Sequence, residues 1–435
     1  MIFTLTSEGG DARSLAGDWL VRAAGAGEWR TVADRGLDES GWQATSTPGR
    51  WWLDPGLADE NAVLYRRHFE LPADLAAELD SAEHDDTHWD THRDTHRDAR
   101  WWLVASGLCE LGHLWFDGTY LGDLRGRHAQ HAFEVDHLLR RGREHLAAVE
   151  AAHGTARVPQ PENAQVQIQR TGPARIQRVR ALVIEASPDR AVLRVAATVD
   201  SSGTHRAEVT TTVLPTADPD AGWSKDPTRQ VAVLGDGLSV SEPVLARGRN
   251  DLEWLVAIER PSLWWPAGMG DQAQYCIDID VAVDGRSSHA VRLPTGIRTV
   301  SIGRGKLAVN GEPHRDGLDA LRIVEHELSH PSFYESANTD GRLLCQQVTL
   351  DPSVFAGAQR GLRALAAQAA SAAADHAGHH PSVATWQPVH PPGNRRRTPR
   401  LSSWADRTAR TAMQVADPTR PQTQIRPKAA LGQRP

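Results

Sequence analysis

Short runs of alternating apolar and polar residues occur along most of the chain. Residues 63–69 and 277–281 alternate with a period of two, which is typical of half-buried β-strands. Asp117-Gly118 between apolar residues predicts a β-hairpin. We therefore expect two all-β units. The first ends near residue 155, and the second, from about 171 to 300, has the length and short strands of an immunoglobulin-like sandwich.

The hydrophobic period changes after residue 305. An Ala-rich run from Ser353 to His376 predicts a helix, with Asp351 as its N-cap and Gly378 at its end. An apolar run at 343–345 precedes this helix, and another at 382–386 follows it. This order of strand, helix and strand indicates a βα unit of a parallel sheet or barrel.

Two segments have a biased composition. The period-four sequence within residues 84–98 places His88, His92 and His96 at helical spacing, which would suit a metal-binding helix, although we favour a surface loop. The segment from Pro388 onward is rich in Pro, Arg, Thr and Gln, so we expect a disordered tail. Its three successive arginines from Arg395 could bind anions, or simply be solvated.

The overall composition excludes several classes of function. The net charge of −7 does not favour nucleic acid or an anionic membrane as a partner. The three cysteines are too widely spaced for a disulfide framework or a CxxC metal pair, and no apolar run is long enough to span a membrane. We see no signal peptide and expect a cytoplasmic protein. The 15 Trp exceed the 6 Phe and 4 Tyr together, and we expect most of them to fill β-sandwich cores.

Short motifs between about residues 12 and 390 occur in a fixed order. They are Leu15-Ala16-Gly17-Asp18-Trp19, Tyr65–Phe69, Leu114–Gly118, Leu263–Pro266, Gly296–Val300, Val309–Pro313, Ala320–Arg322, Phe333–Glu335 and His380–Trp386. This ordered set resembles glycoside hydrolase family two, particularly its β-mannosidase-like and exo-glucosaminidase-like members. The resemblance implies a jelly roll, an immunoglobulin-like sandwich and a (β/α) barrel. It also implies carbohydrate metabolism, by hydrolysis of terminal β-linked sugars such as β-mannosides, without a cofactor.

The resemblance predicts a multidomain, mainly β protein. We expect a jelly-roll sugar-binding-type domain at 1–158, an immunoglobulin-like sandwich at 171–303, a partial TIM-barrel fragment at 304–392 and a disordered tail at 393–435. Only six residues separate Pro313 from Ala320, which is too few for the first βα unit of the family's barrel. The barrel is therefore expected to be incomplete.

The family's catalytic carboxylates have no counterpart in this sequence. Relatives carry Asn-Glu-Pro, with Glu as the catalytic acid/base, where this chain has His390-Pro391-Pro392. They carry Trp-Gln-Asp where this chain has Cys345-Gln346-Gln347, and the strand with the nucleophilic Glu is missing. A retaining glycosidase needs two carboxyl groups about 5 Å apart. We therefore expect no catalytic residue and a degenerate protein without activity.

Three residues remain as candidates for sugar binding. Arg322 matches an arginine that lines the active site in the family, and an ion pair with Glu325 or a nearby Asp is its alternative role. Trp386 could form the wall of a sugar subsite, although core packing is the expectation we favour. Gln346 could bind a hydroxyl group or be a core amide. Carbohydrate is the expected partner, either as substrate of a degenerate glycosidase or as ligand of a non-catalytic binding or scaffold protein.

One motif suggests a different class of protein. His326-Glu327-Leu328-Ser329-His330 is an HExxH sequence, which on a helix would bind zinc for a metalloprotease. Pro331 follows the second histidine and disfavours helix there. We therefore expect no metal and treat a zinc protease as a remote alternative.

Overall fold

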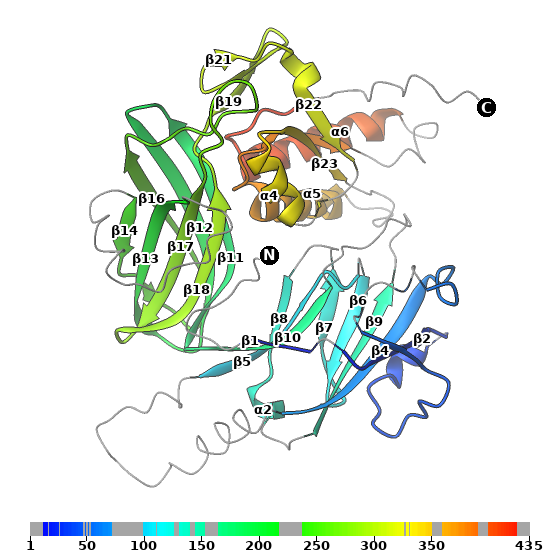
Figure 1. The fold of residues 1–435 in the computed structure, drawn as a ribbon. Coiled ribbons are helices and arrows are strands. Elements are labelled where there is room, and N and C mark those ends of the chain that lie inside the picture. Colours follow the sequence, from blue (N-terminus) through cyan, green and yellow to red (C-terminus); the bar gives the residue numbers. More distant parts are fainter. Residues whose placement is uncertain are drawn as a thin grey trace, which may run out of the picture. The chain divides into compact units, whose positions relative to one another are not determined.

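The computed structural model shows a mainly β protein with two compact units (Figure 1). It describes residues 12–15, 17–25, 27–46, 48, 51, 54–71, 99–109, 111–125, 130–139, 144–152, 164–216, 237–325, 328–329, 331–349, 359–389 and 399–423. One unit comprises the described residues up to 175 together with 286–289, and the other comprises those in 176–285 and 290–423. Several features noted in the sequence lie outside the described residues, namely the repeat in 84–98, Asp351, His326, Glu327, His330 and Pro391.

The first unit is a sandwich of two antiparallel sheets. One sheet has the order β1 (Ala12–Ser14), β10 (Gln165–Thr171), β5 (Arg100–Ser106) and β8 (Gln130–Glu134). The other has the order β3 (Gln43–Thr45), β2 (Trp19–Ala23), β4 (Ala62–Glu70), β9 (Glu144–Ala152), β6 (Leu111–Phe116) and β7 (Thr119–Arg125). A 3₁₀ turn η1 (Glu28–Arg30) lies between β2 and β3, and a short helix α2 (Asp136–Leu139) follows β8.

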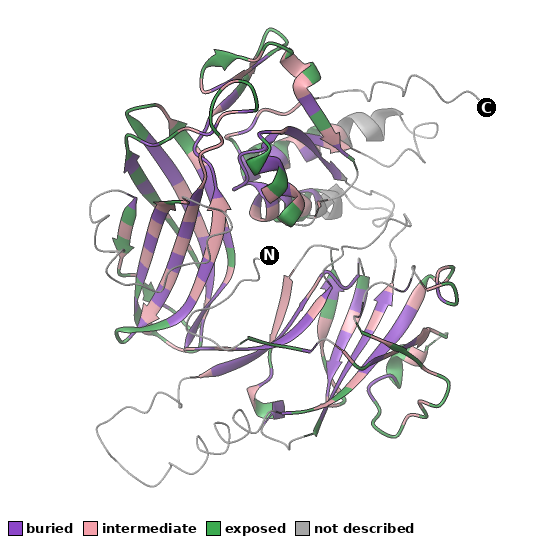
Figure 2. Ribbon diagram, viewed as in Figure 1, coloured by how far each residue is buried: buried purple, intermediate pink, exposed green. Residues whose placement is uncertain are grey.

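The hydrophobic core of this unit lies between its sheets. Trp19, Tyr65, Trp101 and Phe116 belong to the core and are at most 2% exposed. Burial alternates along many strands, as the colour bands of Figure 2 show, because successive side chains point to opposite faces of a sheet. The hairpin predicted at Asp117-Gly118 is confirmed, since both residues have positive φ between β6 and β7.

The second unit contains an immunoglobulin-like sandwich. One sheet has the order β11 (Ala174–Ala186), β12 (Arg190–Ser201) and β16 (Gly248–Glu259). The other has the order β14 (Leu238–Ser241), β13 (His205–Pro215), β17 (Tyr275–Val283) and β18 (Arg286–Thr295), and β15 (Val244–Leu245) also pairs with β13. Leu193 and Val195 of β12 and Ile277 and Ile279 of β17 are buried. The period of two at residues 277–281 therefore predicted a strand correctly.

Three parallel strands follow the sandwich in the same unit. A small antiparallel sheet comes first, with β19 (Val300–Gly303), β20 (Lys306–Val309) and β21 (Glu312–Pro313), and the 3₁₀ turn η4 (Gly317–Ala320) leads directly into β22. The parallel sheet has the order β22 (Leu321–Val324), β23 (Leu343–Thr349) and β24 (Val383–Val389), with helices α4 (Pro331–Thr339) and α5 (Gln359–Ala377) between the strands. Among the described residues these strands do not close into a barrel. We call this part, residues 300–423, the barrel fragment.

The predicted disordered tail was wrong for residues 399–423. Helix α6 (Pro399–Ala416) packs against α5 and β24, with Met413 and Ala416 buried in the core of the barrel fragment. Gln422 then pairs with Trp386 beside β24. The composition suggested disorder, but small apolar residues recur on one face of this segment at helical spacing.

Buried polar contacts join the barrel fragment to the sandwich. The Arg298 guanidinium donates to the carbonyl oxygens of Pro381 and Val383 at 2.9 and 2.5 Å. Trp264 Nε1 donates to the carbonyl of Asn338 at 2.9 Å. Because these groups are buried, their hydrogen bonds cannot be replaced by water, which couples the two parts energetically.

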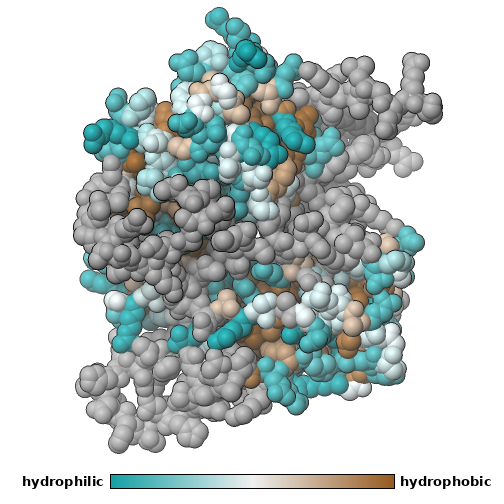
Figure 3. Space-filling view, in the orientation of Figure 1, coloured by the Kyte–Doolittle hydropathy of each residue, from teal (hydrophilic) through white to brown (hydrophobic). Residues whose placement is uncertain are grey.

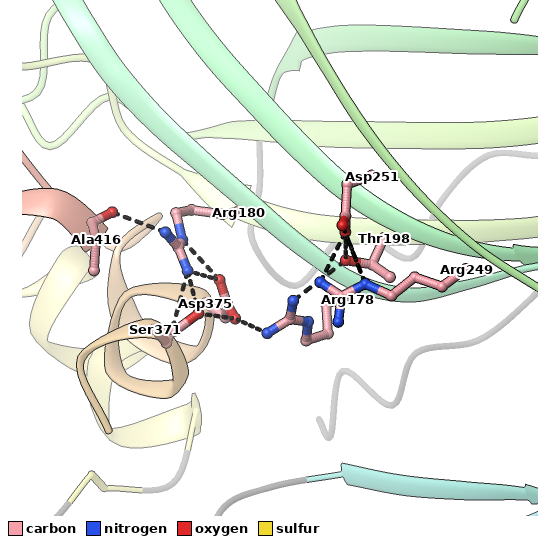
Figure 4. Close-up of polar contacts among 8 residues, drawn as sticks. All are labelled: Arg178, Arg180, Thr198, Arg249, Asp251, Ser371, Asp375 and Ala416. Atoms are coloured by element: carbon pink, nitrogen blue, oxygen red, sulfur yellow. Dashed lines mark hydrogen bonds and ion pairs between the residues drawn. The ribbon is translucent and has the colours of Figure 1, made fainter. Parts of the chain in front are cut away.

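An ion pair extends this junction (Figure 4). Arg180 of β11 lies 2.6 Å from an oxygen of Asp375 of α5 and also donates to the Ser371 hydroxyl and to the carbonyl of Ala416. One arginine therefore holds α5 and the end of α6 on the sandwich sheet. Asp375, near the end of α5, is a half-buried partner of this arginine.

Candidate functional site

The parallel sheet of the barrel fragment has two faces of different character. Leu344 and Val348 of β23 face α4, α5 and α6 in one hydrophobic cluster. Leu343 and Cys345 face the opposite way, in a second cluster with Trp264 and Leu307. We call these the helix face and the inner face. Because the fold is a parallel βα arrangement, the carboxyl ends of its strands are where a ligand is expected.

Gln346 lies on the helix face and is fully buried. The Tyr334 hydroxyl of α4 donates to Gln346 Oε1 at 2.6 Å, and Gln346 Nε2 donates to the carbonyl of Gln347 at 2.8 Å. Burial raises the pKa of Tyr334, so this hydroxyl keeps its proton. The geometry matches the core-amide role that the sequence left open for Gln346.

Trp386 is also fully buried on the helix face. Its indole Nε1 donates to Asp417 at 2.8 Å, and the same carboxylate pairs with Arg420 at 2.8 Å. Burial opposes ionisation of Asp417, but Arg420 and hydrogen bonds from Thr419 and Trp386 outweigh it and lower the pKa. The indole ring thus packs in the core beneath α6 rather than forming a surface wall.

Arg322 lies apart from these two residues. It is exposed on β22, where Leu321 and Ile323 contribute to the inner-face cluster, so alternation directs Arg322 to the other side of the sheet. Gln346 of β23 pairs with Trp386 of β24. Arg322 of β22 pairs with Leu344, which lies two residues before Gln346 on β23. The structure therefore brings Gln346 and Trp386 together and leaves Arg322 near the start of the sheet.

The inner face carries polar residues that the sequence analysis missed as site residues. Gln347 and Gln387 are opposite each other on β23 and β24, and they are only 6% and 8% exposed. Cys345 Sγ donates to Gln387 Oε1 at 3.5 Å, and burial raises the pKa of this thiol to about 11. The signal in the sequence was the alternation of side chains along the strand that begins at Leu343. This alternation places Gln347, and not Gln346, on the face opposite the helices.

No family model matches the chain. A segment of it is 37% identical over 87 residues to the exo-β-D-glucosaminidase of Amycolatopsis orientalis, and this covers 19% of the chain and 8% of that enzyme. A glycosyl hydrolase family 2 member of Bacteroides cellulosilyticus matches 94% of the chain with a TM-score of 0.68 and 14% identity. The chain covers 57% of that protein's length. The chain is glycoside hydrolase family 2-like.

A further solved structure has a similar fold. The β-glucuronidase of Bifidobacterium dentium, complexed with coumarin-3-O-glucuronide, matches 97% of the family-2-like chain with a TM-score of 0.67 and 17% identity. The chain covers 75% of that enzyme. At these identities the structural similarity establishes the shared fold.

Four carboxyl groups in the described part of the family-2-like barrel fragment lie in different surroundings. Asp375 and Asp417 are paired with arginines. Glu335 lies on α4, where burial raises its pKa, and Glu325 is exposed directly after β22. A carboxamide neither donates a proton to a leaving oxygen nor attacks an anomeric carbon, so Gln347 and Gln387 cannot act as the required carboxyl pair.

The described residues provide neither a metal cluster nor a helix that could span a membrane. Within the described residues, no group of three or more His, Cys, Asp or Glu side chains is arranged to hold a metal ion. None of the described helices has the length and apolar character needed to cross a bilayer. The histidines of the HExxH sequence lie outside the described residues and are not part of either observation.

Proposed function

We propose that this protein acts in carbohydrate metabolism by binding β-linked sugars without hydrolysing them. The observation that carries the proposal is the pair Gln347 and Gln387, which places two neutral amides on the inner face towards the carboxyl ends of neighbouring parallel strands. The lineage activity implied by the sequence motifs is hydrolysis of terminal β-linked sugars such as β-mannosides. Amide side chains can hydrogen-bond to hydroxyl groups, but they supply no acid or nucleophilic chemistry.

The comparisons support the ligand class of this proposal. The relative with the matched segment is an exo-β-D-glucosaminidase, and the Bifidobacterium dentium structure contains a glucuronide. Both names concern β-linked sugars, which fits a β-glycoside as ligand here. Of the three residues predicted to bind sugar, Gln346 and Trp386 make their hydrogen bonds inside a core. Arg322 is exposed, but on the side of the sheet opposite to Gln347 and Gln387, so a sugar contact at Arg322 would be separate from that pair.

A cytoplasmic location belongs to the same proposal. Cys109, Cys276 and Cys345 are free thiols. Free and largely buried cysteines fit a reducing compartment better than an oxidising one.

An active glycosidase with relocated carboxyl groups is the rival function. Glu325 at the end of β22 is the carboxyl group that favours it. A panel of aryl β-mannosides, β-glucosaminides, β-glucuronides and β-galactosides tests the proposal directly. We expect no aglycone release above buffer from either the wild type or Glu325→Gln. Turnover by the wild type that Glu325→Gln abolishes would show that the rival is correct.

A further inference from the structure

Four aromatic rings gather on the outer face of the six-stranded sheet in the jelly-roll unit. His113 and Trp115 lie on β6, Tyr120 lies on β7, and Trp29 reaches them from η1. Trp29 stacks on Trp115 with ring centroids 6.4 Å apart and an interplanar angle of 28°. Tyr120 lies 5.6 Å from Trp115 and 5.9 Å from His113. We call these four residues the aromatic platform.

The rings of the aromatic platform differ in exposure to solvent. Trp115 is 6% exposed and belongs to a small cluster on the outer sheet face with Val32, Ala33, Leu64 and Ala148. Trp29 is 39% exposed and Tyr120 is 49% exposed. Hydrophobic residues reach the surface of this unit among hydrophilic ones (Figure 3). Two large rings are thus presented to solvent on a fixed support, which lowers the conformational cost of binding.

Polar groups surround the rings. The Tyr120 hydroxyl donates to Asp123 Oδ1 at 2.5 Å, and Arg125 pairs with Asp123 at 2.8 Å. These contacts lower the pKa of Asp123 to about 2, so this carboxylate is ionised at neutral pH. His113 Nε2 lies 3.6 Å from Glu150 on the neighbouring strand β9. The rim therefore offers both donors and acceptors beside the ring faces.

The charges around the platform balance. The carboxyl groups beside the rings are those of Asp123 and Glu150. The guanidinium groups are those of Arg125, which pairs with Asp123, and of Arg30, which lies 5.1 Å above the Trp29 ring. A charged ligand would gain little from such a balanced rim. A neutral ligand with an apolar C–H face and many hydroxyl groups matches both the rings and the rim.

We propose that Trp29 and Tyr120 form a binding platform for a neutral β-linked oligosaccharide, separate from the parallel strands of the barrel fragment. This inference rests on the proposed carbohydrate-binding function and assigns it a location. The sugar rings stack on the exposed aromatic faces, and their hydroxyl groups bond to Asp123, Glu150 and Arg30. Arg30 moves from the Trp29 face to the ligand edge.

Isothermal titration of the full chain with β-1,4-mannotetraose and cellotetraose tests the platform. We expect dissociation constants of the order of millimolar for the wild type. Trp29→Ala and Tyr120→Ala should each weaken binding about five- to tenfold, whereas Tyr120→Phe retains most of it because the ring remains. Leu255→Ala removes a 56% exposed apolar side chain of the other unit and should leave binding unchanged. A glucuronate-containing tetrasaccharide should bind more weakly than the neutral ones.

The outcomes separate this inference from the proposed function. Binding by the wild type that Trp29→Ala and Tyr120→Ala leave unchanged would overturn the platform and leave the proposed function standing. Absence of binding to both neutral oligosaccharides would overturn both. Trp29 also packs on Trp115, so thermal melting must show that Trp29→Ala is folded. If it is not, Tyr120→Ala with its matched Tyr120→Phe decides the result, because the Tyr120 ring is the more exposed.

Discussion

At the scale of single residues, the indole of Trp386 links the parallel sheet to the segment after α6. It donates to Asp417, which Arg420 and Thr419 also hold. Trp386→Phe removes the indole donor and part of a buried ring. We expect the free energy of unfolding to fall by about 2–4 kcal/mol, measured by urea denaturation. Val244→Ala, at a 65% exposed position of the same unit, should change it by less than about 0.5 kcal/mol. Equal effects of the two substitutions would contradict the core role of Trp386.

Two adjacent buried histidines make the stability of the same unit sensitive to acid. Burial, reinforced by His376 and Arg420, lowers the pKa of His379 to about 3, and the pKa of His380 is also lowered, by burial first and by His379 next. His380 Nδ1 accepts a hydrogen bond from Asn338 at 2.9 Å, and its Nε2 finds no partner among the described residues. Both rings are therefore neutral in the folded protein.

This arrangement predicts how stability changes with pH. Below a pKa of about 6.5 the unfolded chain binds protons that the folded chain cannot, so stability is full above that pH and falls as the pH drops towards 3. The slope should approach about 1.4 kcal/mol per pH unit for each histidine. Urea denaturation between pH 7 and pH 4 measures it. His379→Gln should reduce the slope, and an unchanged slope in that variant would contradict the assignment.

Single residues also show how much of the candidate site could be predicted from the sequence. It identified Gln346 and Trp386 as candidates because they match positions of a family motif, and it left core roles open for both. The sequence Leu343–Gln347 already showed which side chains of the strand share a face. Deciding which of the two faces is covered by helices requires knowing where the helices lie. That information comes from long-range packing, such as Tyr334 on Gln346, which no local pattern contains.

At the scale of elements, Arg180 fastens α5 and α6 to β11. Arg180 and Asp375 are 20% and 18% exposed, so removing the arginine leaves a carboxylate in a poorly solvated position. Arg180→Met should therefore lower the free energy of unfolding by about 2–3 kcal/mol, and Arg180→Met combined with Asp375→Leu should recover part of this loss. Urea denaturation of the four members of this double-mutant cycle gives the coupling energy.

A second pair in Figure 4 provides a matched control. Arg249 and Asp251 form an ion pair at 2.9 Å but are 60% and 63% exposed. Arg249→Met should cost less than about 1 kcal/mol, because exposed ion pairs are weakened by solvent. A larger loss for Arg249→Met than for Arg180→Met would mean that the Arg180 contact does not hold the helices.

The elements differ in how well the sequence predicted them. The hairpin at Asp117-Gly118 and the helix now seen as α5 followed from local rules of turn chemistry and periodicity. The helix α6 did not, because the prediction relied on the Pro- and Arg-rich composition around it. Its stability comes from Met413 and Ala416 packing against residues more than thirty positions earlier, such as Ala370.

At the scale of the whole molecule, the barrel fragment and the immunoglobulin-like sandwich belong to one compact unit and the jelly roll to another. We therefore expect two calorimetric transitions, and Arg180→Met should lower the melting temperature of only one of them. Trp19→Phe, which removes the buried hydrogen bond from Trp19 Nε1 to the carbonyl of Leu15, should lower only the other. A separate transition of the barrel fragment would contradict its coupling to the sandwich.

The order of the modules was predictable from the sequence, whereas the contacts between the barrel fragment and the sandwich were not. Strand periodicity and the ordered motifs indicated two β units followed by a βα arrangement. The coupling of the barrel fragment to the sandwich depends on single buried contacts, such as Arg298 with the carbonyls of Pro381 and Val383. Arg298 lies in a motif of the resemblance, but its partners are more than eighty residues away.

The central proposal is that this family-2-like protein binds β-linked sugars without a working catalytic carboxyl pair. A β-configured cyclitol aziridine tests it most directly, because such a compound forms a covalent bond with a glycosidase nucleophile only when an acid and a nucleophile act together. The intact chain would be incubated with probes of the manno, gluco, glucuronic and galacto configurations and analysed by mass spectrometry. The account predicts no added mass with any probe. Stoichiometric labelling of one Asp or Glu, prevented by substituting that residue, would show that the protein is an active glycosidase.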